Sequence, residues 1–186
     1  MKTSDILQAF HGMPACDRLD LLCRMLHYCV PYEAHFLGTV LVDTSREHYK
    51  SFVNKAEVSA NRVNYYSGFK DMGLTHDVCE KLCCALAVVH ADNHPVAEVV
   101  FNLLNDPKVL KQMDELKDMK VMQDFRLLYV MGVHHPAFTF NQRQLLLYTY
   151  LQQMDTMFAE KAKFGFSLSN SMEVGGFVCV WVFVYF

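Results

Sequence analysis

The sequence predicts an all-α protein, an antiparallel stack of helices closer to a short α-solenoid than to a four-helix bundle. Apolar residues recur at spacings of three and four from residue 4 to residue 163, and no strand-like alternation occurs before Phe164. Only 8 Gly and 5 Pro are present among 186 residues, too few for a loop-rich β architecture. We therefore expect seven to nine helices forming one domain over residues 4–163.

The segment from Cys16 to Arg46 shows two predicted helices most clearly. In the first helix, polar and apolar residues lie on opposite faces. The polar positions are Asp17, Asp20, Arg24 and His27, and the apolar positions are Leu19, Leu22, Cys23, Leu26 and Val30. Pro31 then opens a second amphipathic helix, because the first helical turn needs no amide donor there. Its apolar positions are Ala34, Phe36, Leu37, Val40 and Leu41. The pattern predicts a helical hairpin.

The other helices are predicted from their boundary residues. A short helix is expected over residues 4–11, and a new helix after a cap at Ser45. Residues 61–74 contain two glycines and little periodicity, which predicts a connector. Further helices are expected after Thr75, after Asn93 and from Pro107 onward. Thr139 and Gln142 have the spacing of a capping box, which predicts a long last helix.

The composition changes abruptly after Lys163. Residues 164–186 end in ten uncharged β-branched and aromatic residues, an aggregation-prone composition. The ten closing residues are fewer than the roughly 20 apolar residues that a membrane-spanning helix needs. We considered a strand, an abnormal translated end of a longer protein and a weak membrane anchor, and we favour the second. We expect an irregular apolar C-terminal tail outside the domain.

Composition also limits the classes of function. The net charge of −3 argues against a strongly basic nucleic-acid surface. The first ten residues lack the apolar region of a secretory signal. Seven cysteines, an odd number, lie mostly at apolar helical positions, which indicates reduced thiols in a core. We therefore expect a cytoplasmic protein.

Three groups of residues could support chemistry, but each has a simpler interpretation. Two cysteine clusters with nearby histidines could seed a metal site, but neither has the spacing of a zinc knuckle. The pair His134-His135 has no carboxylate at a recognisable partner spacing, so a helix-ending turn is favoured. The cysteine clusters are Cys23, His27 and Cys29, and Cys79, Cys83, Cys84 and His90. Phosphate-binding loops and nucleophile elbows are also absent from the sequence. We expect no enzyme activity, metal or cofactor.

Particular strings resemble a known family. They are Arg18-Leu19-Asp20-Leu21-Leu22-Cys23, Leu26-His27, Pro31-Tyr32-Glu33, Phe36-Leu37-Gly38-Thr39, Tyr49, Ala56-Glu57, Ala60-Asn61 and His135-Pro136-Ala137-Phe138-Thr139-Phe140 with Gln142. They look like the N-terminal helical domain of the CCHC zinc-knuckle proteins related to Smaug, a group that includes nematode germline-survival proteins. The similarity spans roughly Ile6 to Met157.

This resemblance implies a pseudo-HEAT helical domain in cytoplasmic proteins that regulate RNA. Such proteins act as adaptors between RNA and translational regulators or non-canonical poly(A) polymerases. The present sequence contains neither the zinc knuckle nor an evident SAM domain, the modules expected to contact RNA. We therefore expect a protein–protein interaction module, truncated relative to the family, with weak or absent RNA contact.

Two alternatives from other classes remain open. The chain could be a membrane-associated protein held by its tail, although we expect no stable membrane insertion. It could also be a hydrolase or metal protein that uses the His and Cys positions. If RNA is bound directly, the residues expected to contact it are Arg126, Arg143, Lys161 and Lys163.

Overall fold

A computed structural model describes the backbone of residues 2–69, 72–73, 75–116 and 118–163, and the side chains of these residues except 47–58, 114 and 154–163. The described residues form α-helices joined by short turns and one 3-10 helix, and they contain no strand. The predicted all-α class is therefore confirmed. The predicted tail, residues 164–186, lies outside the described residues, and the domain boundary at residue 163 stays a prediction.

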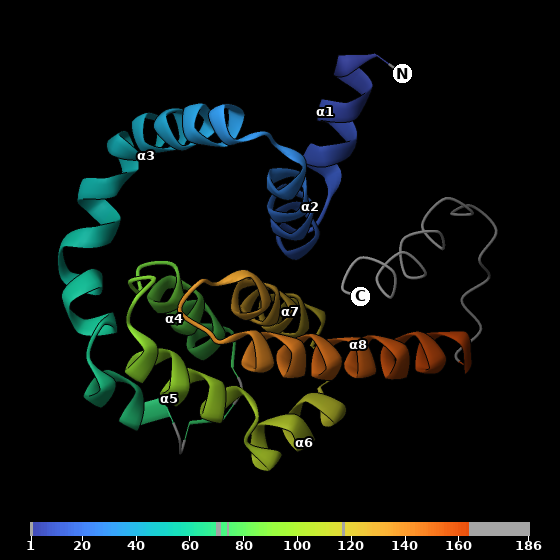
Figure 1. Ribbon diagram of the computed structural model, residues 1–186. Coiled ribbons are helices and arrows are strands. Elements are labelled where there is room, and N and C mark those ends of the chain that lie inside the picture. The colour runs from blue at the N-terminus through green and yellow to red at the C-terminus, as the bar shows by residue number, and fades with distance from the viewer. Residues whose placement is uncertain (1, 70–71, 74, 117, 164–186) are drawn as a thin grey trace. The chain divides into compact units, whose positions relative to one another are not determined.

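The first helices follow one another with sharp joints (Figure 1). Helix α1 spans Thr3–Gly12, α2 spans Ala15–Tyr28 and α3 spans Pro31–Ala60. As predicted, Pro31 opens α3, and the Glu33 carboxylate accepts a hydrogen bond from the Val30 amide at 3.0 Å. The predicted new helix after Ser45 is wrong, because α3 continues through this residue. The Ser45 hydroxyl instead donates to the carbonyl of Val42 within the same helix.

The expected connector after α3 contains the 3-10 helix η1, Val63–Phe69. Its Tyr66 ring is buried, and the Tyr66 hydroxyl donates to the carbonyl of Ala60 at 2.9 Å. Hydrogen bonds of the Asn61 side chain connect this region to the turn between α4 and α5. The Asn61 amide group donates to the Val88 carbonyl and its side-chain oxygen accepts from the His90 amide, both at 2.9 Å. A segment with little periodicity is thus ordered by side-chain to backbone hydrogen bonds.

Four of the five remaining helices begin where the sequence predicts. The five are α4 (His76–Leu86), α5 (His94–Leu104), α6 (Pro107–Glu115), α7 (Met119–His134) and α8 (Phe140–Lys163). Helix α7 begins after Asp118, which was not predicted as a cap. The side chains of Thr75 and Asn93 accept hydrogen bonds from the third residue after each cap. Thr139 and Gln142 form the reciprocal pair of a capping box. Caps of this kind satisfy amides that have no partner within the helix.

The core is formed mainly by η1, α4, α5, α7 and the first half of α8. Helix α7 packs against α4, and its buried residues include Phe125, Leu128 and Tyr129. Gly132 allows a close approach to α8, because a β-carbon there would lie 3.0 Å from the Leu146 side chain. Most of the hydrophobic free energy of folding therefore comes from the second half of the described chain.

The residues Met1–Leu151 form one compact unit, and Gln152–Phe186 form a second. The described part of the second unit is the continuation of α8 to Lys163. None of the helices formed by the described residues is both long enough and apolar enough to cross a membrane.

Replacing Tyr129 with Phe should lower the free energy of unfolding by about 1–2 kcal/mol. The Tyr129 hydroxyl is fully buried and donates to the Leu104 carbonyl at 2.6 Å, so the variant leaves that carbonyl without its partner. Urea denaturation measures the change. Tyr28→Phe is the matched control, because Tyr28 is 79% exposed, and it should shift stability by less than about 0.5 kcal/mol. Equal effects of both substitutions would contradict the assignment.

Candidate protein-interaction surface

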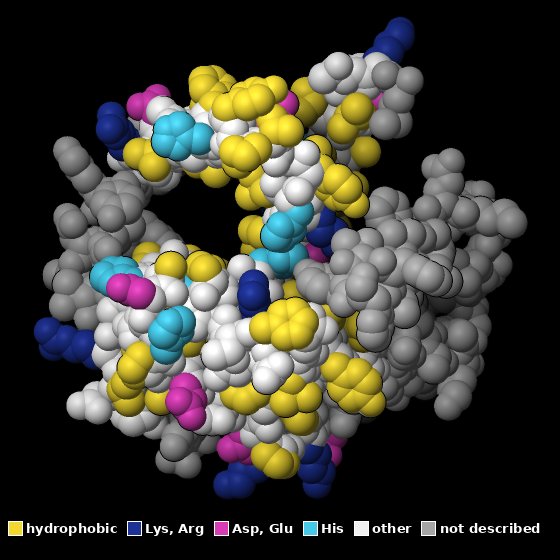
Figure 2. All heavy atoms as spheres, viewed as in Figure 1, with side chains coloured by type: hydrophobic (Ala, Val, Ile, Leu, Met, Phe, Trp, Pro, Cys, Tyr) yellow, Lys and Arg dark blue, Asp and Glu magenta, His cyan; other side chains and the backbone are white. Residues whose placement is uncertain are grey.

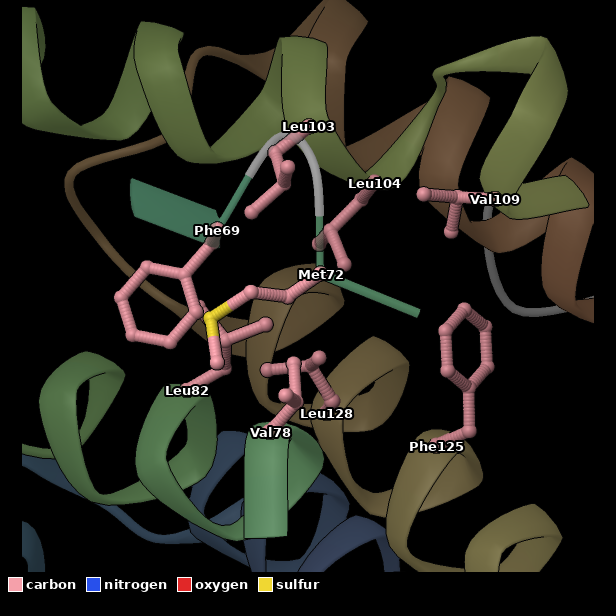
Figure 3. Close-up of a pocket in the computed structure, with 9 residues that line it drawn as sticks. All are labelled: Phe69, Met72, Val78, Leu82, Leu103, Leu104, Val109, Phe125 and Leu128. Carbon is pink, nitrogen blue, oxygen red and sulfur yellow. The ribbon is translucent and has the colours of Figure 1, made fainter. Parts of the chain in front are cut away.

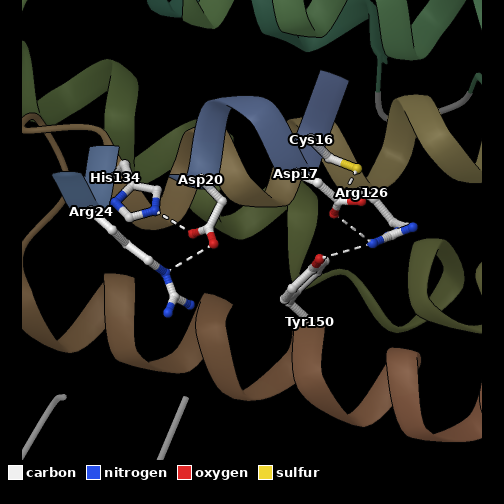
Figure 4. A network of polar contacts seen from close by, with 7 residues as sticks. All are labelled: Cys16, Asp17, Asp20, Arg24, Arg126, His134 and Tyr150. Atoms are coloured by element: carbon white, nitrogen blue, oxygen red, sulfur yellow. Dashed lines mark hydrogen bonds and ion pairs between the residues drawn. The ribbon is translucent and has the colours of Figure 1, made fainter. Parts of the chain in front are cut away.

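Helix α2 meets the core partly through polar side chains. Asp17 and Asp20 point toward α7, whereas Leu22, Leu26 and Val30 are exposed (Figure 4). The side of α2 that meets the core is mixed, because Asp17 and Asp20 lie there beside the half-buried Leu19, whereas in the usual arrangement the apolar face covers the core. Cys16 is the one residue of α2 that is buried. An arrangement of this kind leaves apolar side chains on the outside.

The first polar contact lies at the start of α2. An Arg126 amino group lies 3.0 Å from the Asp17 carboxylate and 3.4 Å from the Tyr150 hydroxyl (Figure 4). The Cys16 thiol sits beside Asp17, and burial raises its pKa to about 11, so the thiol stays protonated. This contact joins three helices, α2, α7 and α8, through one guanidinium group.

The second polar contact lies one turn further along α2. The Asp20 carboxylate accepts a hydrogen bond from His134 Nε2 at 2.8 Å and pairs with Arg24 at 2.9 Å. Both the Asp20 and the His134 side chains are mostly buried, with 16% and 9% exposed. The sequence contains no local sign of this partner, because 114 positions separate the two residues and no spacing rule covers such a pair. The helix-ending turn predicted at His134-His135 is present, since α7 ends at His134, and the carboxylate partner of His134 comes from a distant part of the sequence.

The exposed hydrophobic residues gather on α1, α2 and the first half of α3 (Figure 2). We call a set of these residues on α2, on α3 and in the joint between them the outer apolar face. It consists of Leu22, Met25, Leu26, Val30, Tyr32, Phe36, Leu37, Val40 and Leu41. Tyr32 is 75% exposed and Phe36 is 65% exposed. Exposed large apolar side chains gathered in this way are characteristic of an interaction site.

The first half of α3 has no place in the core. Every residue from Val30 to Arg46 is exposed. Isolated helices of roughly this length are marginally stable in water, because the cost of nucleation is not repaid by packing. The surface charges here form only an exposed pair, Asp43 with Arg46 at 3.7 Å, which contributes little. A partner that packs on the outer apolar face would stabilise this helix.

A small cavity lies inside the core between α4, α5 and α7 (Figure 3). Its volume is about 10 Å³, which is about the space of one water molecule. The lining residues are Phe69, Met72, Val78, Leu82, Leu103, Leu104, Val109, Phe125 and Leu128. None offers a polar side-chain group to a ligand. We interpret the cavity as a small packing defect and not as a binding site.

The cysteine clusters are placed as structural side chains. Cys79 is fully buried, and burial raises its pKa and that of Cys83 to about 12. Cys23 is half-buried on α2, whereas His27 is exposed. Among the residues that the structure describes, no three His, Cys, Asp or Glu side chains are grouped to hold a metal ion. Thiols with raised pKa values are poor nucleophiles and poor ligands at neutral pH.

The four residues predicted to contact RNA lie in α7 and α8. Arg126 is engaged by Asp17 and Tyr150, and Arg143 is half-buried. Lys161 and Lys163 lie in α8, beyond the described side chains. RNA contact by these residues stays a prediction, and contact by Arg126 would require its present partner Asp17 to be displaced.

His135 closes the turn between α7 and α8. Its Nδ1 accepts a hydrogen bond from the Ala137 amide at 3.1 Å, and its ring packs edge-on against Phe138. Burial lowers the pKa of His135 below its usual range, although hydrogen bonds to the backbone of Val89 and Leu86 offset part of this effect. The Nδ1 atom has no free lone pair once protonated, so the turn requires the neutral imidazole.

Two family models match this chain. The SMAUG-like PHAT domain matches residues 53–157, more than half of the chain. The RNA-binding protein vts1-like domain matches residues 3–47, which correspond to α1, α2 and the first half of α3. The Smaug-related part of the resemblance is therefore confirmed, whereas the link to zinc-knuckle proteins stays a prediction. The contacts of Asp17 and Asp20 with α7 join the two matched segments.

The stability of the chain should fall as the pH drops below about 6.5, the ordinary pKa of histidine in an unfolded chain. Because the pKa of His135 is lower in the folded state, the unfolded state binds the proton first, and acid favours unfolding. The contribution is complete above a pH of about 6.5 and is lost as the pH falls through the folded-state pKa. Urea denaturation at a series of pH values from neutral to mildly acidic measures this slope.

His135→Asn keeps an acceptor near the Nδ1 position but cannot titrate. We expect it to be less stable than the original chain at neutral pH and to depend less on pH. His27→Asn, at an exposed position, is the control and should leave the slope unchanged. An unaltered slope in His135→Asn would show that other groups cause the pH dependence.

Proposed function

The chain belongs to the SMAUG-like PHAT domain family, and we propose that it is a non-enzymatic helical adaptor in the post-transcriptional regulation of mRNA. Its role is to bring protein partners to an RNA-bound complex. The family descriptions support the RNA-regulatory setting, since they name domains of the Smaug and vts1 type. The exposed apolar surface of α2 and α3 supports the protein-binding role.

The outer apolar face is the observation on which this proposal rests. Its aromatic and aliphatic side chains belong to α2, α3 and the joint between them, and they are exposed instead of packed inside the unit. Interaction sites are dominated by a few large side chains, Tyr among them, that become buried against the partner. A partner helix could place its apolar side chains along Tyr32, Phe36 and Val40, which lie four residues apart on α3.

The partner is expected to be a protein of an RNA-regulatory complex, with a non-canonical poly(A) polymerase as one candidate. Direct RNA contact is expected to be weak, because the net charge is −3 and Arg126 is already paired with a carboxylate. We place the protein in the cytoplasm on the family resemblance. Enzyme activity is not part of the proposal, and the buried thiols of Cys79 and Cys83 have raised pKa values, which makes them poor nucleophiles.

The partner does not have to be identified for a tethering experiment to test the adaptor role. The full chain is fused to a phage coat protein and recruited to a reporter mRNA that carries the coat-protein hairpins. We expect the tethered chain to change reporter translation or poly(A)-tail length severalfold. Unchanged reporter output would overturn the proposed function.

The double variant Phe36→Glu and Val40→Glu should remove this effect. Both side chains are exposed and belong to the same row of α3, so the charges should block a partner while leaving the core folded. Leu145→Glu, at a 46% exposed position of α8, is the matched control and should keep the effect. Full activity of the Phe36/Val40 variant would show that the outer apolar face is not the docking surface.

A further inference from the structure

We propose that the Asp17–Arg126 ion pair and the hydrogen bond between Asp20 and His134 form a polar latch, which docks α2 on α7 and can release it while the core stays folded. The latch joins the vts1-like segment to the PHAT-like segment. It would therefore set where the first helices, including the outer apolar face, lie relative to α7. Such a conformational change does not depend on the proposed function.

Helix α2 contributes little apolar surface to its interface with the core. Of its fourteen residues, Cys16 alone is buried. Leu19, Leu21 and Cys23 are half-buried, whereas the side chains of Leu22, Met25 and Leu26 face outward. Docking therefore removes less apolar surface from water than it would if Leu22, Met25 and Leu26 faced the core, and the hydrophobic effect holds α2 less firmly than it holds the core.

For the polar contacts of α2, the cost of desolvation offsets most of the electrostatic attraction. Desolvation offsets most of the attraction when an ion pair is buried. The Arg126 side chain is 20% exposed, and its Nε atom is buried with no hydrogen-bond partner among the described residues. The His134 side chain is 9% exposed, and it meets Asp20 through Nε2. The net free energy of docking is therefore small, and α2 can separate from α7 at a modest cost in free energy.

The core does not need α2 to stay packed. The fully buried large side chains come mainly from η1, α4, α5, α7, α8 and the turn before α8, and Tyr66, Phe125 and Tyr129 are among the largest. These elements also contact one another directly, α4 with α7 and α5 with η1. Loss of α2 would uncover polar atoms of Arg126 and His134, which water can solvate. The core should therefore stay intact when α2 is released.

Hydrogen exchange detects the release, because a free helix of fourteen residues is only marginally stable and its amides exchange readily. The full chain is exchanged in about 0.1 M and about 1 M sodium chloride and analysed by mass spectrometry. Raising the salt in this way shortens the Debye length from about 10 Å to about 3 Å and weakens chiefly the Asp17–Arg126 pair, because the Asp17 side chain is 43% exposed. We expect faster exchange over residues 15–28 at high salt and unchanged exchange in α5.

The double variant Asp17→Asn and Asp20→Asn removes both charges of the latch. We expect exchange over residues 15–28 to accelerate about tenfold or more at low salt, because the partly exposed Asp17–Arg126 pair and the mostly buried Asp20–His134 contact are both weakened. The salt dependence should largely disappear. Asp43→Asn breaks an exposed ion pair on α3 and is the control, with no change expected in α2.

Two results would overturn the proposal. If residues 15–28 exchange only together with the core peptides of α4 and α5, release requires global unfolding and there is no latch. If neither salt nor the Asp17/Asp20 variant accelerates exchange in α2, the docking rests on apolar contacts and not on charge.

Discussion

Helix α7 organises the structure, because it packs on two sides through different interactions. One side is apolar and buries Phe125, Leu128 and Tyr129 in the core, which closes around it. The other side carries Arg126 and His134 toward the carboxylates of α2. The first contact is apolar, whereas the second consists of the Asp17–Arg126 ion pair and the Asp20–His134 hydrogen bond. The two segments matched by separate family models meet at this helix.

The orientation of α2 links the fold to the proposed role. Because Asp17 and Asp20 point toward α7, Leu22 and Leu26 remain exposed, and further exposed apolar residues follow on α3. A helix that buried those leucines would gain about 1.5–3 kcal/mol for each side chain, but it would remove the interaction surface. Using polar contacts for docking keeps the apolar residues free to meet a partner.

Much of the fold was predictable because helix boundaries are local features. Thr75, Asn93 and Thr139 cap their helices through hydrogen bonds within three residues. The break expected at Ser45 was wrong for a related reason, since a serine hydroxyl can also bond within a helix and no longer-range contact was visible to decide between the two. The role of Asn61 was missed, because its partners lie 27 to 32 positions away.

The order of amino acids is enough to define the helical class, the position of most helix ends and the two-faced character of α2, because each depends on residues within a turn or two of one another. Which face of α2 meets the core was settled by the packing of the folded chain. That choice depends on Arg126 and His134, which lie more than a hundred positions from Asp17 and Asp20. A periodic pattern records that two faces differ, but it carries no information about the chemistry of the surface that each face will meet.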